Sequence, residues 1–248
     1  MNPAEYTNLE RIERDHWYYN GKRAVVRDWL ERAGPVVRSG ILLDCGAGTG
    51  LFAEEMAASC RVLVLDDHEE ALRLLRRRFS PEQVLALAGD RLPLADGAVD
   101  YLTALDVLEH IEHDAAAVRE MSRVLRVGGV AVFTVPASRA LWSDWDVALH
   151  HFRRYDRSQL NALFPAPTWE IVYLNYTNVL VYPAVWMIRK WRAFRQRLGW
   201  IDRSARTEDR VPPAWLNALL RSVFVRMARW RIPFPFGVSL ILVARRRV

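Results

Sequence analysis

The sequence predicts an α/β fold with a doubly wound, mostly parallel seven-stranded sheet and an α-helical insertion before the last strand. Two observations predict it. Between residues 41 and 136, short apolar runs alternate with amphipathic segments, which is typical of parallel strands joined by right-handed helical crossovers. After residue 136 the alternation stops, and about 60 residues separate the last two apolar runs. The length of 248 residues is sufficient for one large domain with a substantial core.

The expected elements follow in order along the chain. Residues 3–33 should form two helices with Gly21 between them, and Gly34 followed by Pro35 should end the second. Apolar runs predict strands at residues 41–45, 61–66, 83–90, 98–106, 130–136, 169–176 and 237–244. Apolar spacing of three and four predicts helices at residues 49–59, 68–79, 114–126, 180–198 and 215–230, and two short helices with a loop within residues 138–164.

A glycine-rich turn follows the first predicted strand in "LLDCGAGTGLF", residues 42–52. Its glycines at positions 46, 48 and 50 let a ligand approach the backbone closely. A nicotinamide or flavin fingerprint would need a third glycine at position 51, which is leucine, and a P-loop would need lysine followed by serine or threonine. Asp66, at the end of the second strand and 20 residues after Gly46, suits the hydroxyls of a ribose. The pattern therefore predicts a site for an adenosine-bearing cofactor of another kind.

At these residues the chain resembles the class I S-adenosylmethionine-dependent methyltransferases, in particular those of type 11. The resemblance covers about residues 42–136 and includes "LLDCGAGTG", "VLVLDDHEEAL", "AGDRLPLADGAVDYLTALDVLEHI" and "VLRVGGVAVFTVP". The chain has Val127 where the family usually has proline before the glycines. The resemblance implies a Rossmann-like fold, S-adenosylmethionine as the cofactor and methyl transfer as the reaction.

The resemblance also implies a cofactor site. It assigns cofactor binding to Asp44, Gly46, Ala47, Gly48, Gly50, Asp66, Asp67, Asp90, Arg91, Asp106 and Leu108. The glycine turn would lie beneath the methionine part, and Asp66 would bind the ribose. Asp90 would accept a hydrogen bond from the adenine amine. Asp44 would orient the loop or the cofactor's ammonium, and Leu108 would help to close the pocket near the sulfonium.

Two further motifs indicate an acceptor side. "ERDHWYYNGKR" near the N-terminus and "HHFRRYD" after the fifth strand resemble a bacterial subgroup with E-x-x-H-W and H-x-R-R-Y motifs. The predicted acceptor-binding residues are His16, Trp17, Tyr19 and Arg154. The predicted catalytic residues are His110, His151 and Tyr155. A hydroxyl acceptor benefits from a base that takes its proton, and an arginine suits an anionic acceptor group.

A metal-assisted reaction is the alternative at "DVLEHI". The chain resembles the ubiquinone-pathway O-methyltransferases here, and in them an acidic-and-histidine cluster is linked to a divalent metal. Asp106, Glu109 and His110 could form such a cluster. Because their spacing is short, we expect no metal in this site.

A basic, tryptophan-rich segment precedes the last strand. Residues 176–236 contain twelve basic and three acidic residues, a net charge of +9, and five of the ten tryptophans. The predicted helices at 180–198 and 215–230 each carry an apolar stripe among the basic residues, which suits an anionic membrane surface. The same stripes could instead cover the sheet or a dimer partner. We reject a membrane span at residues 171–188, because this uncharged run includes two asparagines, a proline and a predicted strand.

Composition limits the setting. The formal net charge is +6. Cys45 and Cys60 form no disulfide framework or metal-ligand spacing, and no signal peptide is expected at the N-terminus. We therefore expect a cytoplasmic protein, with the inner face of the membrane as an alternative. We divide the chain into an N-terminal helical lid (1–35), a cofactor-binding core (36–175), a basic helical insertion (176–236) and the last strand with its tail (237–248).

The predicted function is S-adenosylmethionine-dependent methylation of a small-molecule or lipid-like acceptor, with O-methylation favoured. An RNA methyltransferase and a nonenzymatic cofactor-binding scaffold are the alternatives. "ALDVL" stands where the amino-methylating nucleic-acid enzymes have an Asn/Asp-Pro-Pro-aromatic motif, which argues against a nucleic-acid acceptor. We keep a homodimer as an alternative to a monomer.

Overall fold

The computed structural model describes residues 3–87, 89–200 and 211–248. Its seven-stranded sheet has the order β3-β2-β1-β4-β5-β7-β6, and only β7 among these strands runs antiparallel to its neighbours. The strands are β1 (Ile41–Cys45), β2 (Arg61–Asp66), β3 (Val84–Ala86), β4 (Val99–Leu105), β5 (Leu125–Pro136), β6 (Trp169–Thr177) and β7 (Ser239–Arg246). The chain order reverses between β1 and β4, where doubly wound sheets bind ligands. The predicted fold class is confirmed.

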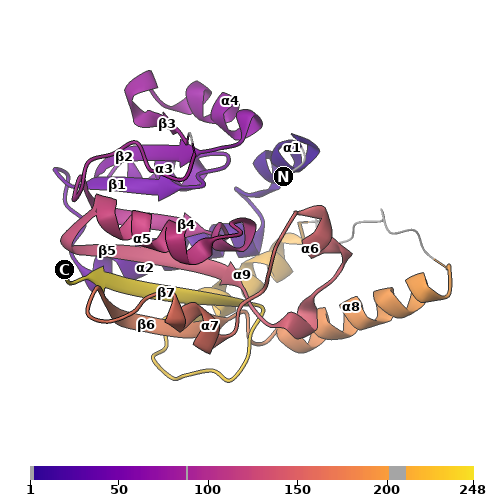
Figure 1. Cartoon of the computed structure of the whole chain (residues 1–248). Helices are drawn as coiled ribbons and strands as arrows, with labels where there is room; N and C mark the ends of the chain where they lie inside the picture. The colour runs from indigo at the N-terminus through magenta and orange to yellow at the C-terminus, as the bar shows by residue number, and fades with distance from the viewer. Residues whose placement is uncertain (1–2, 88, 201–210) are drawn as a thin grey trace.

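Helices cover both faces of the sheet (Figure 1). They are α1 (Pro3–Ile12), α2 (Trp17–Ala33), α3 (Leu51–Met56), α4 (Glu69–Arg78), α5 (Asp114–Val124), α6 (Asp144–Ala148), α7 (Arg157–Ala162), α8 (Tyr182–Arg197) and α9 (Ala214–Ala228). Buried side chains of α2, α3, α4 and α9 share one apolar cluster, and those of α5 and α7 share the other. In Figure 1, α8 extends away from the sheet on the side of the strands' carboxyl ends.

The apolar strands are buried on both faces, as the uninterrupted runs predict. Leu42 and Leu43 of β1 are both fully buried, and they belong to opposite clusters because successive side chains of a strand point to opposite faces. On one face, the Trp29 ring of α2 stacks on Tyr173 of β6, with ring centroids 3.8 Å apart. The Trp29 Nε1–H also donates to the carbonyl of Ala228 in α9 (3.0 Å). The N-terminal segment and the insertion are thus joined over the sheet.

Three predicted boundaries were wrong. The helix expected at residues 49–59 is shorter, because Gly50 adopts a left-handed φ of 81° and α3 begins after it. The strand expected at residues 83–90 is limited to β3. The helix expected at residues 114–126 ends at Val124, and β5 begins at Leu125 instead of residue 130, so Gly128 and Gly129 lie within the strand. A Cβ on Gly129 would come within 2.9 Å of the Asp100 carbonyl, so the glycine permits a close approach of β4 and β5.

Both predicted insertion helices are present, but they differ in setting. α9 packs along α2 and buries Phe224 and Val225 in the core, so its stripe covers the body of the protein. α8 instead buries Arg189 and exposes large apolar side chains, among them Met187 and Trp191. Three basic positions of the insertion, Arg203, Arg206 and Arg210, lie outside the described residues. Among the described helices, none combines the length and the apolar character that crossing a bilayer requires.

Candidate active site

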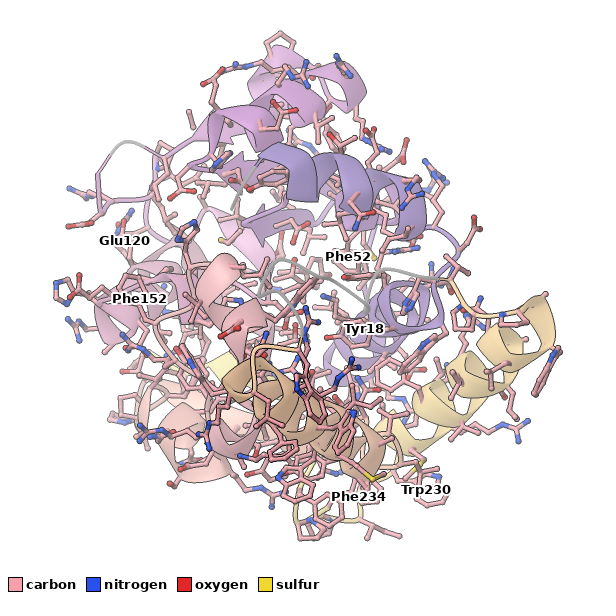
Figure 2. All side chains as sticks on the ribbon, turned by 90° about the vertical axis from the view of Figure 1, so that its right-hand side faces the viewer. Tyr18, Phe52, Glu120, Phe152, Trp230 and Phe234 are labelled. Carbon is pink, nitrogen blue, oxygen red and sulfur yellow. The ribbon has the colours of Figure 1, made fainter. Side chains whose placement is uncertain are left out.

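A cavity of about 1480 Å³ lies at the carboxyl ends of the central strands. Its wall combines the glycine turn, the end of α1, the start of α2, the loop after β4, residues 145–154 and the start of α8. Figure 2 views this end of the molecule, with Tyr18 and Phe52 of the wall on one side and Glu120 and Phe152 on the other. Sites for one small molecule usually measure about 300–1,000 Å³. The cavity therefore has room for a cofactor and an acceptor.

The three glycines of the turn have different surroundings. All three have positive φ, at 64° for Gly46, 58° for Gly48 and 81° for Gly50. A Cβ on Gly46 would lie 2.5 Å from Val107, and one on Gly50 would lie 2.7 Å from Leu75, so these two positions serve packing. A Cβ on Gly48 would meet nothing within 4 Å, since it would point into the cavity. Gly48 is therefore the glycine that leaves space for a ligand.

Asp66 fastens this turn to the end of β2. Its Oδ2 accepts a hydrogen bond from the Gly48 amide (2.9 Å), and its Oδ1 accepts one from the His68 amide (3.0 Å). Burial raises the pKa of Asp66, and the Gly48 amide opposes this rise by favouring the charged form. The carboxylate lies on the cavity wall, where it can both shape the turn and accept from a ribose.

Asp44 lies beneath the same turn and is almost fully buried. Its Oδ1 accepts a hydrogen bond from the Thr103 hydroxyl of β4 (2.7 Å). Burial raises the pKa of Asp44 to about 7, although the bond from Thr103 opposes the rise. A cation that entered the cavity beside Asp44 would favour the ionised carboxylate.

The other predicted cofactor residues divide into two groups. Ala47, Asp67 and Asp90 lie on the cavity wall. Gly50, Arg91 and Leu108 lie outside it. Leu108 is fully buried in the core, and the side chain of Arg91 is exposed. The structure therefore gives Leu108 a packing role, because the 3₁₀ turn that follows β4 directs this side chain inward.

Asp106 is already engaged by the N-terminal segment. It has a positive φ of 57°, and its Oδ2 accepts from the Lys22 ammonium of α2 (2.7 Å) while its Oδ1 accepts from the Thr134 hydroxyl (3.0 Å). Burial would raise the pKa of Asp106, but Lys22 outweighs it and holds this pKa below its usual range. Lys22 lines the cavity and was missed by the sequence analysis. Its partner Asp106 lies 84 residues away in the sequence, so no local sequence pattern predicted this contact.

The predicted N-terminal acceptor residues His16, Trp17 and Tyr19 all lie on the cavity wall. The ring of His16 caps α2 by accepting from the Tyr18 amide (3.3 Å). The Trp17 amide donates to the Asn217 side chain of α9 (2.8 Å). The start of α2 is therefore held in place by the insertion.

A buried carboxylate, Asp146, organises the acceptor side. It is fully buried, and its Oδ1 accepts from the Arg154 Nε (2.6 Å) and lies 3.1 Å from the Nδ1 of His151. Its Oδ2 lies 3.4 Å from the Arg189 guanidinium of α8. Burial would raise the pKa of Asp146, but the contacts with His151 and Arg154 hold it below its usual range. His151, Arg154 and Arg189 all line the cavity.

Asp146 was not predicted from the sequence, although a signal for its local structure was present. Ser143 followed by an acid at position 146 is a capping-box pattern, and it forms at the start of α6. The pattern predicts a helix start. It does not predict that the same carboxylate is shared with His151 and two arginines.

Tyr155 lies away from the cavity wall. It is buried, and its hydroxyl donates to the carbonyl of Leu108 (3.1 Å) or to Asp114 Oδ2 (2.8 Å). Burial, followed by the contact with Asp114, raises its pKa. The prediction of a catalytic Tyr155 therefore receives a correction: its hydroxyl ties the H-x-R-R-Y segment to the loop after β4.

Glu109, His110 and His151, here called the Glu109 cluster, meet on the cavity wall. One potential ligand atom of each lies within 4.8 Å of the others. Glu109 is fully buried, and neither of its carboxylate oxygens has a hydrogen-bond partner. Burial raises the pKa of Glu109 well above its usual range, and burial with His151 lowers the pKa of His110 to about 4. Asp106, the third member of the predicted metal alternative, is bound to Lys22 instead.

Comparison with known proteins agrees with this site. Residues 43–133 match the family model described as a methyltransferase domain. A "Probable S-adenosylmethionine-dependent methyltransferase" of Mycobacterium tuberculosis is 30% identical over 137 residues, which are 54% of this chain and 50% of the relative. The match thus spans about half the length of that relative.

Two solved structures share the fold. The protein that forms a complex with the Trm112 methyltransferase activator of Haloferax volcanii superposes with a TM-score of 0.63 at 17% identity, over 99% of this chain and 96% of that one. Phosphoethanolamine N-methyltransferase 2 of Haemonchus contortus, in complex with S-adenosylmethionine, superposes with a TM-score of 0.56 at 15% identity, over 90% and 52%. The family match covers residues 43–133, which include the glycine turn, and the two superpositions show that the chain shares the fold of these proteins.

Proposed function

We propose that the protein transfers the methyl group of S-adenosylmethionine to a hydroxyl of a small-molecule or lipid-like acceptor. The glycine turn, Asp44 and Asp66 would hold the cofactor. His151 would be the general base that takes the proton of the acceptor hydroxyl. S-Adenosylmethionine supplies an activated methyl group, so the protein has to align the acceptor with it and exclude water.

The observation that carries O-methylation is the contact between His151 and Asp146. A carboxylate at Nδ1 fixes the orientation of the imidazole and leaves Nε2 as the atom that can accept a proton. A neutral amine acceptor would need no such base. Buried Asp146 also stabilises the imidazolium that proton transfer would create.

The wall beside His151 favours an acceptor with an apolar part. Val181, Val185 and Ile188 at the start of α8 and Phe152 of the H-x-R-R-Y segment line the cavity there. Arg154, which we predicted to bind the acceptor, donates to Asp146 and to the carbonyl of Ala137 (3.0 Å). We therefore assign Arg154 to positioning of Asp146.

The test is release of S-adenosylhomocysteine with a panel of phenols and hydroxylated amphiphiles. His151→Asn should lower kcat by about 10²–10⁴-fold and leave the affinity for S-adenosylhomocysteine unchanged. His150→Asn is the matched control, because His150 lines the same cavity next to His151 but Asp146 contacts the His151 ring, and asparagine tolerates the φ of 58° at position 150. Equal kcat in wild type and His151→Asn would overturn the assignment of the base.

The alternatives give different results in the same assay. An RNA methyltransferase would release S-adenosylhomocysteine only with RNA. A nonenzymatic scaffold would bind the cofactor and turn over no acceptor. Arg189, one of the basic residues on which the RNA reading depended, is buried against Asp146, so it is not part of an exposed basic surface.

A further inference from the structure

Helix α8 buries a charged side chain and exposes an apolar stripe. Its charged residue Arg189 is buried against the body, where the guanidinium donates to the carbonyl of Leu141 and contacts Asp146. A stripe of its apolar side chains is exposed. Those on and beside α8 that are between 46% and 63% exposed include Leu180, Met187, Trp191, Phe194 and Leu198. Helices on the surface of a soluble domain normally have the opposite orientation.

Helix geometry places these side chains on one stripe. At 3.6 residues per turn, positions 187, 191, 194 and 198 fall on one face, and Arg189 falls on the opposite face. Lys190, Arg195 and Arg197 fall on the two flanks of the stripe. Residues 180–200 include five basic and no acidic residues. An apolar stripe with tryptophan and basic flanks is typical of a helix that lies in a lipid–water interface.

A neighbouring loop also exposes apolar side chains. The rings of Tyr182 at the start of α8 and Phe236 before β7 are 5.1 Å apart. Trp230, Ile232 and Phe236 of this loop are also exposed, and Figure 2 shows Trp230 and Phe234 at the lower edge of the molecule. The loop therefore lies beside the start of α8, and we call the exposed stripe of α8 the α8 platform.

We propose that the α8 platform docks on an anionic membrane surface. The basic residues beside the stripe, Lys190, Arg195 and Arg197, attract anionic lipid and oppose the approach of a second copy of the same platform. The exposed tryptophan, phenylalanine and methionine side chains enter the interface. Val181, Val185 and Ile188 line the cavity, so docking brings the acceptor side of the cavity to the bilayer. This inference stands independently of the reaction proposed above.

The experiment is flotation of the full chain with two kinds of vesicle, phosphatidylcholine alone and phosphatidylcholine with 30% phosphatidylglycerol. The anionic content of the second vesicle is on the order of the content that gives a membrane surface potential near −30 mV. Binding is expected to be stronger to the anionic vesicles, and this difference should shrink as salt shortens the Debye length from about 10 Å at 0.1 M to about 3 Å at 1 M.

Two variants separate charge from insertion. Lys190→Gln with Arg195→Gln and Arg197→Gln should weaken vesicle binding at least tenfold, since each basic residue at such a surface contributes about fivefold. Arg38→Gln with Arg77→Gln and Arg119→Gln is the matched control, because it removes the same charge from exposed positions outside α8.

Trp191→Gln with Phe194→Gln should abolish the binding that persists at high salt. Both side chains face outward, so thermal stability should be unchanged. Folded wild type that floats with neither vesicle overturns the proposal, and so does an equal loss in the two charge variants. Sedimentation showing a dimer that Trp191→Gln with Phe194→Gln converts to a monomer also overturns it, because a second copy would then cover the stripe. Salt-sensitive binding to RNA without vesicle binding is a fourth overturning result.

Discussion

Asp44 links cofactor affinity to pH. Burial raises its pKa from 3.8 to about 7, and the proposed partner of its carboxylate is the cofactor's ammonium. An ammonium binds the ionised carboxylate in preference to the neutral acid. The apparent Kd should therefore rise as Asp44 is protonated, by about tenfold between pH 8 and pH 6 for a pKa of about 7.

The same carboxylate should have the opposite effect on the stability of the cofactor-free protein. Because the folded pKa is raised above the unfolded value, ionisation costs folding free energy, and this cost develops as the pH rises from about 4 to about 7. The rise from 3.8 to about 7 corresponds to up to about 4 kcal/mol at pH 8. Asp44→Asn removes the charge and keeps an acceptor for the Thr103 hydroxyl. We expect it to be more stable than wild type at pH 8, with a smaller difference at pH 5.

Calorimetry with S-adenosylhomocysteine at pH 6, 7 and 8 measures the affinity, and urea unfolding at pH 5 and 8 measures the stability. Asp44→Asn should bind more weakly than wild type at pH 8 and show little dependence on pH. Wild-type affinity that does not change between pH 6 and 8 would refute the reasoning. If the affinity of Asp44→Asn still depended on pH, we would assign that dependence to Asp66, because burial also raises the pKa of Asp66.

Three further predictions concern the same cavity. Gly48→Ala and Gly199→Ala should each cost about 1–2 kcal/mol of backbone strain, since both glycines have positive φ and open space at Cβ, but only Gly48→Ala should abolish binding of S-adenosylhomocysteine in calorimetry. Tyr155→Phe should lower the free energy of unfolding by about 1–3 kcal/mol and leave kcat unchanged; normal stability with slow turnover would restore a catalytic role. Treatment with a chelator should leave turnover unchanged, whereas a loss that divalent ions reverse would make the Glu109 cluster a metal site.

The cofactor half of the site was predictable because its residues are local to strand ends. Gly48 follows β1 and Asp66 is the last residue of β2, and parallel pairing of these strands brings their carboxyl ends together. The hydrogen bond between the Gly48 amide and Asp66 follows from that register. The alternation of strands and helices also predicted the parallel part of the sheet. Sequence spacing therefore contained most of the geometry on which cofactor binding depends.

The acceptor half was less predictable because its contacts join distant segments. Lys22 meets Asp106 across 84 residues, and Arg189 meets Asp146 across 43. The local sequence around each of these residues predicts a charge exposed to solvent. Only the packing of distant segments buries it. Tyr155 illustrates the reverse case. Its motif suggested catalysis, but the hydroxyl finds Asp114 in the folded protein.

Arg189 provides a last test, because it connects the α8 platform with the proposed base. Asp146 contacts both the Arg189 guanidinium and His151, so loss of Arg189 should loosen α8 and leave Asp146 with less positive charge around it. We expect Arg189→Met to lower the melting temperature and kcat while the affinity for S-adenosylhomocysteine is unchanged. Lys190→Met is the matched control: it removes the same charge from an exposed position of α8, and should weaken vesicle binding without lowering the melting temperature. Equal melting temperatures for the two variants would contradict an anchoring role for Arg189, because removing one partner of a buried ion pair normally costs about 3–5 kcal/mol.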